Sequence, residues 1–202
     1  MQKTVRVWDI LIRLFHWTLV IAFFTAYLSE DESKTVHQAA GYTVMGLIAF
    51  RLLWGFIGTR YARFSEFVKG PRTTARYLGE MATGKAPRYL GHNPAGAAMI
   101  VALLISLTCT TVLGVILLAT DGHGPLAGTL FAHLREHTVE EVHEFFANTS
   151  IFLVLFHVIG VLLSSLLHRE NLVRSMISGR KRLDNESVPT QATVNDTSTV
   201  IG

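Results

Sequence analysis

The sequence is poor in the residues from which many soluble enzyme and metal sites are built. Only one of its 202 residues is a cysteine, Cys109, and it lies inside an apolar run. A single thiol excludes a disulfide framework, a zinc ribbon or an iron–sulfur site formed by this chain alone. Charged residues are also scarce, at 16%, whereas half of the residues are hydrophobic and the mean hydropathy is +0.36. This balance is unlike that of a soluble domain and indicates a membrane protein.

Four apolar stretches are long enough to cross a bilayer, which takes about 20 helical residues. They are Ile10–Leu28, Ala39–Ile57, Ala95–Ala119 and Val142–Leu167. Open sheet edges cannot face lipid, so these stretches are predicted to be helices. Basic residues precede the first stretch, as in a signal peptide, but no small-residue cleavage site follows it, and we expect a retained span. The predicted fold is therefore all-α: an integral membrane four-helix bundle.

Lysine and arginine are distributed unevenly between the predicted loops. Sixteen of the 18 lie at the N-terminus, in or beside the loop after the second span, or at the C-terminus, and the other two are Lys34 and Arg135. By the positive-inside rule, both termini and the middle loop are expected to be cytoplasmic. We therefore predict a multi-pass protein of the bacterial inner membrane. Residues 1–182 form one membrane domain in this scheme, and the polar residues 183–202 form a disordered cytoplasmic tail.

Four of the nine histidines lie in or at the ends of the spans: His16, His37, His143 and His157. Ionisable side chains in a bilayer are costly and usually functional. The first span runs outward and the second and fourth run inward, which places His16 and His157 in the inner half of the membrane and His37 and His143 near its outer face. His143 and His157 are fourteen residues apart, which on a helix is about 21 Å and within about 40° of one face. The sequence thus predicts two pairs at two depths, His16 with His157 and His37 with His143.

Two haems, each held between two histidines, suit this arrangement best. A zinc or copper site needs ligands that converge on one atom at about 2 Å, and two pairs separated by most of the membrane do not converge. A proton relay usually includes buried carboxylates, and no Asp or Glu lies deep in any span. A histidine that only hydrogen-bonds within the bundle is an alternative for any one position. Small residues on the same helix faces leave room for a porphyrin, although such residues also let membrane helices approach closely: Gly41, Ala147, Gly160 and Ser164.

Other residues carry less specific predictions. Arg13 and Arg51 lie near the inner ends of their spans, where either could pair with an anionic haem propionate or anchor its span by snorkelling. His92 precedes Asn93–Pro94, which is typical of a helix start, and is interpreted as local structure, with a propionate or quinone contact as the alternative. The stretch PRTTARYLGEM, from Pro71, fits either a short interfacial helix or an irregular basic loop.

Several motifs, in order along the chain, resemble one known family. VRVWDILIRLFHW, TVHQAAGY, GHNPAGA and VEEVHEFFANTSIFLVLFHVIGVLLSSLLHRENLVRSMISGRK are similar to segments of the prokaryotic cytochrome b561 family, which includes the cytochrome b subunits of nickel–iron hydrogenases. The likeness runs over about residues 4–182. It implies a four-helix membrane bundle with two b haems, whose ligand histidines correspond to His16, His37, His143 and His157.

The expected function is transmembrane electron transfer through two bis-histidine haem b groups, between the quinone pool and a redox partner on the periplasmic side. The resemblance implies as partners membrane lipid, quinone and a periplasmic cytochrome or a dehydrogenase or hydrogenase, and we expect no nucleic acid. No side chain is expected to act as a catalyst. One alternative is a stand-alone quinone oxidoreductase that oxidises a small periplasmic reductant such as superoxide. Another is a haem-free membrane transporter or anchor. The sequence does not decide between the partnered and the stand-alone role.

Overall fold

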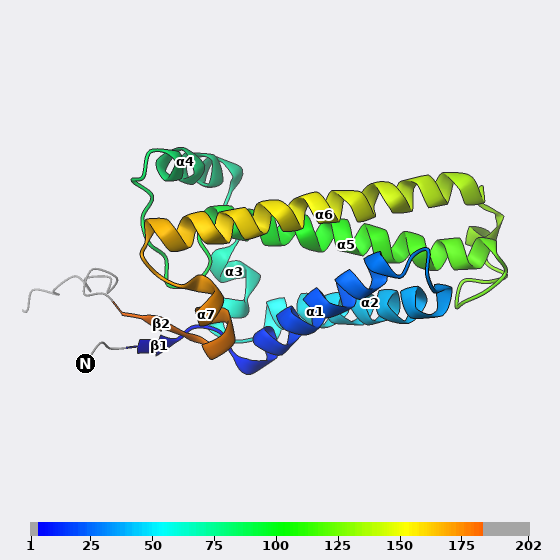
Figure 1. Ribbon diagram of the computed structural model, residues 1–202, viewed down its shortest axis with the longest axis horizontal. Helices are drawn as coiled ribbons and strands as arrows, with labels where there is room; N and C mark the ends of the chain where they lie inside the picture. The colour runs from blue at the N-terminus through cyan, green and yellow to red at the C-terminus, as the bar shows by residue number, and fades with distance from the viewer. Residues whose placement is uncertain (1–3, 184–202) are drawn as a thin grey trace, which may run out of the picture.

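The computed structural model describes residues 4–183, so the tail expected at 183–202 lies, from residue 184 on, outside the described residues. Its main body is a bundle of four long helices along the long axis of the molecule (Figure 1): α1 (Ile10–Leu28), α2 (Lys34–Ile57), α5 (Pro94–Thr120) and α6 (Glu136–Leu167). Each is long and apolar enough to cross a membrane. The prediction of a mainly helical protein with four candidate spans is confirmed.

Two of the spans begin earlier than predicted. α2 begins at Lys34 rather than Ala39, with Ser33 as its N-cap, and α6 begins at Glu136 rather than Val142. Hydropathy locates only the apolar part of a helix, and the first turns of these two are polar. As a consequence, His37 and His143 lie inside regular helix, where the backbone fixes the direction of each side chain.

The bundle exposes large apolar side chains outward along its length. Leu28, Phe56, Ile57 and Leu166 are each more than 70% exposed. Exposed apolar surface of this extent is not found on soluble monomers and fits a surface covered by lipid. The interior is correspondingly small and centres on one cluster, formed by Ala22, Phe23, Val44, Ile48, Leu104 and Leu107.

The four helices form two closely packed pairs, α1 with α2 and α5 with α6, joined through α2 and α5. Within the second pair, Ser106 Oγ lies 2.9 Å from Ser150 Oγ, and both hydroxyls also lie within hydrogen-bond distance of the Phe146 carbonyl oxygen. Hydrogen bonds of this kind help to hold membrane helices together, because lipid offers no competing partner. Ser150 lies midway between His143 and His157, so this contact fixes α6 against α5 between the two histidines.

Both ends of the described chain lie at one end of the bundle (Figure 1). Strand β1 (Thr4–Arg6) pairs antiparallel with β2 (Arg180–Arg182), next to helix α7 (Leu172–Ser178). The middle loop lies at the same end and contains η1 (Arg60–Ala62), α3 (Phe64–Phe67) and α4 (Pro71–Ala82), whereas the loop with η2 (Leu130–His133) lies at the opposite end. The end at which the described chain begins and ends therefore holds most of its lysine and arginine. We call it the inner end and the opposite one the outer end.

The stretch that begins at Pro71 is a regular helix, α4, rather than an irregular loop. Pro71 occupies its first turn, where the missing N–H has no intrahelical partner to lose. Tyr77 is almost fully buried, which docks one face of α4 onto the rest of the inner end. The short β1–β2 pair and α7 were not predicted.

Gly179 is expected to hold the inner end together. It ends α7 with a φ of 77°, a left-handed conformation that glycine adopts without penalty. Its carbonyl oxygen accepts hydrogen bonds from the N–H groups of Val7 (2.9 Å) and Trp8 (3.2 Å), and a Cβ at this position would lie 2.7 Å from the Trp8 carbonyl oxygen. Replacing Gly179 by alanine should therefore lower the free energy of unfolding by about 1–3 kcal/mol.

The measurement is the midpoint of thermal unfolding in detergent. Gly84→Ala is the matched control, because Gly84 also has a positive φ (71°) but a Cβ there would meet open space. The difference between the two variants then reports the contact with Trp8, separately from backbone strain. Equal midpoints would show that the contact contributes nothing.

Candidate functional site

The structure brings His37 of α2 and His143 of α6 together near the outer end. Their ring centroids are 6.2 Å apart and the ring planes are inclined by 70°. His37 Nδ1 donates to the Ala26 carbonyl oxygen, and His143 Nδ1 donates to the Thr110 carbonyl oxygen, each at 2.9 Å. A hydrogen bond from Nδ1 fixes the tautomer and leaves Nε2 free as a ligand atom. Ala26 can supply its carbonyl because it lies in the last turn of α1, where carbonyl groups have no intrahelical partner.

His16 of α1 and His157 of α6 form the second pair, toward the inner end. Their ring centroids are 6.5 Å apart, with the planes inclined by 49°. Trp17 packs edge-on against the His16 ring at a centroid distance of 5.0 Å. His16 Nδ1 is enclosed and has no hydrogen-bond partner among the described residues. The inner pair therefore lacks the backbone anchor that each histidine of the outer pair has.

Both separations match two imidazoles that share one metal. A metal–nitrogen bond is about 2 Å long and the ring nitrogen lies about 1 Å from the centroid, so two imidazoles on opposite sides of a metal have centroids about 6 Å apart. Rings in direct van der Waals contact would be closer, and the unrelated His92 and Trp8 rings, for example, lie 4.5 Å apart. Each pair is thus spaced as two axial ligands on one atom are. The structure places the four histidines as predicted, and their role as ligands stays a prediction.

A cavity of about 280 Å³ lies beside the outer pair, between all four long helices. Both histidines line it, together with the small residues Gly41, Gly114 and Ala147. A Cβ added at Gly41 would meet open space, whereas one at Gly114 would lie 3.1 Å from His143 Cε1. Gly41 therefore borders free volume, and Gly114 makes room for the imidazole itself.

Space is also present beside the inner pair. Gly160 follows His157 by three residues on the same face of α6, and a Cβ there would meet nothing within 4 Å. Within the part of the chain that the structure describes, no group of three or more His, Cys, Asp or Glu side chains gathers.

Comparison with known proteins identifies the family of this chain. A family model described as prokaryotic cytochrome b561 matches residues 7–179, which is most of the chain. The chain belongs to the prokaryotic cytochrome b561 family. This confirms the resemblance found in the sequence. Proteins of this family are multi-pass membrane cytochromes that bind haem b and take part in electron transport.

Two curated relatives of this b561-family protein align with it over most of their length. It is 25% identical over 218 residues to a probable Ni/Fe-hydrogenase B-type cytochrome subunit of Bradyrhizobium diazoefficiens, with 90% of this chain and 87% of that protein aligned. It is 27% identical over 214 residues to the protein of the same description from Azotobacter chroococcum mcd 1, with 88% of each chain aligned. No solved structure gives a significant match.

The residues present fit haem b. Each histidine pair has the separation that bis-imidazole ligation requires, and Gly41 and Gly160 border open space at the two depths. At the inner end, Arg51 is only 4% exposed and its Nη1 has no hydrogen-bond partner among the described residues. A buried cation without a partner suits the anionic propionate of a porphyrin. The donor set, the free space and the buried charge therefore all match the family cofactor.

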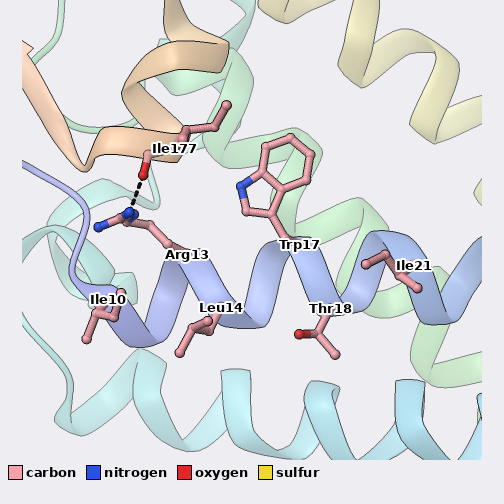
Figure 2. Close-up of a pocket in the computed structure, with 7 residues that line it drawn as sticks. All are labelled: Ile10, Arg13, Leu14, Trp17, Thr18, Ile21 and Ile177. Atoms are coloured by element: carbon pink, nitrogen blue, oxygen red, sulfur yellow. Dashed lines mark hydrogen bonds between the residues drawn. The ribbon is translucent and has the colours of Figure 1, made fainter.

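The two arginines named from the sequence have different surroundings. Arg13 donates to the Ile177 carbonyl oxygen and so ties α1 to α7 (Figure 2). It lines a shallow apolar groove on the outside of α1, with Leu14, Trp17 and Ile21. Arg51 lies inside the protein, with its guanidinium 4.8 Å from the Phe64 ring centroid. Arg51 is therefore the better candidate for a propionate partner. Arg13 already has a structural role, because it donates to the Ile177 carbonyl oxygen.

The inner depth of Arg51 could have been predicted from its distance along the sequence from His37. It follows His37 by fourteen residues on α2, just as His157 follows His143 on α6. Fourteen residues keep a side chain within about 40° of one helix face, so α2 presents a histidine at the outer depth and an arginine at the inner depth. The prediction from sequence applied this spacing only to α6. The backbone anchors of the outer pair, by contrast, leave no signal in the sequence.

Proposed function

We propose that this protein carries electrons across the bacterial inner membrane through two haem b groups, one held by His37 and His143 and the other by His16 and His157. The observation that carries the proposal is the pair of centroid separations, 6.2 and 6.5 Å, at two depths of one bundle. α6 supplies one histidine to each site, so a single rigid helix sets the distance between them. When bound, haem supplies one-electron redox chemistry at its iron.

The protein's own residues would bind and tune the two groups. A histidine on each side would hold each group and would leave no position at the iron for oxygen to bind. The Nδ1 hydrogen bonds to Ala26 and Thr110 hold the outer imidazoles in place and increase their basicity. These features support electron relay rather than bond-making chemistry by side chains.

The orientation and the exchange partners are part of the same proposal. The inner end carries both ends of the described chain and most of the basic residues, which supports a cytoplasmic location for it and a periplasmic location for the outer end. Quinone is the membrane-soluble partner. The likeness to hydrogenase cytochrome subunits supports a hydrogenase or another dehydrogenase as the protein partner. The family membership favours a cytochrome over a haem-free transporter or anchor.

The outer end has features suited to a protein partner. Its cavity is rimmed by carboxylates that outnumber the single lysine, Lys34: Glu30, Asp121, Glu136, Glu140 and Glu144. Beside it, the loop with η2 exposes Leu130, Phe131 and Leu134. Apolar side chains surrounded by charge of one sign are typical of surfaces that bind a complementary protein. This supports a partnered role over a stand-alone one.

The deciding experiment is a reduced-minus-oxidised visible spectrum of the detergent-purified protein, combined with a pyridine haemochrome assay. We expect two low-spin haem b groups per chain, because two histidines would hold each group. Purified protein expressed with haem available and correctly folded, as judged by circular dichroism, serves as the sample. A colourless protein, or a single haem per chain at saturation, would contradict the proposal.

A further inference from the structure

Two polar groups at the inner end are buried beside the same aromatic ring, that of Phe67, and each has a nitrogen without a hydrogen-bond partner among the described residues. The first is Arg51 of α2, whose guanidinium lies 4.8 Å from the Phe64 ring centroid and 5.8 Å from the Phe67 ring centroid. A Cβ at Gly55 would lie 2.0 Å from an atom of the Phe64 ring, so the glycine lets this ring pack against α2 and cover the arginine. Arg51 Nη1 is enclosed and unpaired among the described residues.

The second group is the imidazole of His92, just before α5. Its ring packs between those of Trp8 and Phe67, at centroid distances of 4.5 and 4.6 Å. His92 Nδ1 is enclosed and has no hydrogen-bond partner in the part of the chain that the structure describes. Burial lowers the pKa of His92 to about 3, and the positive charges of Arg51 and Lys181 lower it further. The ring is therefore neutral and able to donate a hydrogen bond from Nδ1.

The nearby carboxylate does not satisfy these groups. Asp9 attracts the Arg51 guanidinium electrostatically, but its oxygens already accept hydrogen bonds from Thr59 Oγ1 (2.6 Å), Trp54 Nε1 (3.2 Å) and the Ile12 N–H (2.9 Å). A buried charge without a hydrogen-bonded counterpart is strongly unfavourable, and buried polar atoms are nearly always paired. Two unpaired donors around the Phe67 ring are thus suited to an anionic oxygen from outside the chain.

We propose that Arg51 and His92 together form the site that binds a carboxylate of the inner haem, with His92 as its second donor. The proposal rests on the inner haem of the proposed function and adds a residue to it. Trp8 and Phe67 hold the imidazole from both sides, and Phe64 and Phe67 hold the guanidinium, so the two donors are fixed before the carboxylate arrives. The segment after β1 and the loop before α5, which carry Trp8 and His92, thereby close the inner site.

The expected effect of the site is on the inner haem's midpoint potential. Donors that neutralise a carboxylate weaken its attraction for the oxidised iron, so removing them lowers the potential. Arg51→Gln removes a full buried charge and should shift the oxidised-to-reduced ratio about tenfold, which is about 59 mV for a one-electron couple. His92→Phe keeps a ring between Trp8 and Phe67 but removes the donor, and it should give a smaller shift in the same direction. His92→Gln, which restores a donor, should recover most of the parent value.

The test is a redox titration of the purified haem-loaded protein, together with redox-difference infrared spectra of protein that carries haem labelled with ¹³C at its carboxylates. The labelled carboxylate bands should shift in His92→Phe and return in His92→Gln. His168→Phe is the matched control, because His168 is another inner-end histidine with an enclosed, unpaired ring nitrogen. If His92→Phe does not fold, His92→Leu, which also removes the donor, gives the same comparison against His92→Gln.

Each outcome is decisive. Unchanged labelled bands and potentials in His92→Phe, in a protein that holds two haems, would overturn the proposal and leave the proposed function intact. Unlabelled bands that shift instead, or bands that respond to added phosphate, would show that a lipid phosphate or free anion occupies the site and would also overturn it. A parent protein with fewer than two haems would overturn both the proposal and the proposed function, and the haem assay identifies that case.

Discussion

Replacing His143 by leucine is expected to halve the haem content of the protein, from two groups per chain to one, and to abolish electron transfer across the membrane. His143 is the residue that α6 contributes to the outer pair, and its ring faces His37 at 6.2 Å. Leucine fills similar space but offers no ligand atom. Because loss of one hydrogen-bond partner of a metal ligand already reduces affinity or activity by about 10–100-fold, loss of the ligand itself should reduce transfer by at least about 100-fold.

His137→Leu is the matched control for this variant. His137 lies on the same helix, near the outer end, and its exposed side chain has Nε2 3.6 Å from a Glu141 carboxylate oxygen rather than facing another histidine. The control should retain two haems per chain and the parent rate. The measurements are the pyridine haemochrome assay and the rate at which an external donor reduces quinone in proteoliposomes. Two haems retained in His143→Leu would show that His143 is not a ligand. Loss of both haems would show that the sites do not fill independently.

The sequence was sufficient to predict the spans and the histidine pairs for one physical reason. In a bilayer, helices are the only structure for a lone apolar segment, and their regular rise converts residue number into depth. The residue numbers of His143 and His157 therefore define their depths in the membrane, and the same holds for the histidines opposite them. The predicted spans were short at Lys34 and Glu136 because hydropathy does not detect polar first turns that extend out of the membrane.

The inner end was much less predictable, because its contacts join polar segments far apart in the sequence. Nothing periodic marks β1 and β2 as partners, and nothing in the sequence pairs the buried Lys181 with the buried Glu170, whose carboxylate lies 3.8 Å from its ammonium. Similarly, His92 precedes a helix cap and resembles a local feature, and its enclosure by Trp8 and Phe67 arises only in the folded chain. Long-range packing of this kind has no signature in composition or spacing. The residues that tune a site are therefore harder to identify from sequence than its ligands.

The other large effect is expected from Gly41→Phe, which should block the outer haem while leaving the fold intact. Gly41 lines the outer cavity, one turn after His37, and a Cβ there would meet open space. A phenylalanine ring can therefore enter the cavity without displacing protein atoms. Glycine inside a helix is unfavourable by about 0.5–1 kcal/mol relative to alanine, so the substitution should not destabilise α2. The ring would then occupy the volume that a porphyrin needs, although all four histidines are still present.

Gly46→Phe separates this steric effect from a general effect of a large residue on α2. Gly46 also borders open space, but it lies five residues further along and about 140° around the helix, where its exposed position faces lipid. We expect one haem per chain in Gly41→Phe and two in Gly46→Phe, with equal unfolding midpoints for the two haem-free proteins. Two haems in Gly41→Phe would mean that the porphyrin lies on another side of the His37–His143 axis. Loss of haem in both variants would mean that α2 tolerates no large side chain, and the open space at Gly41 would then no longer support a haem at this position.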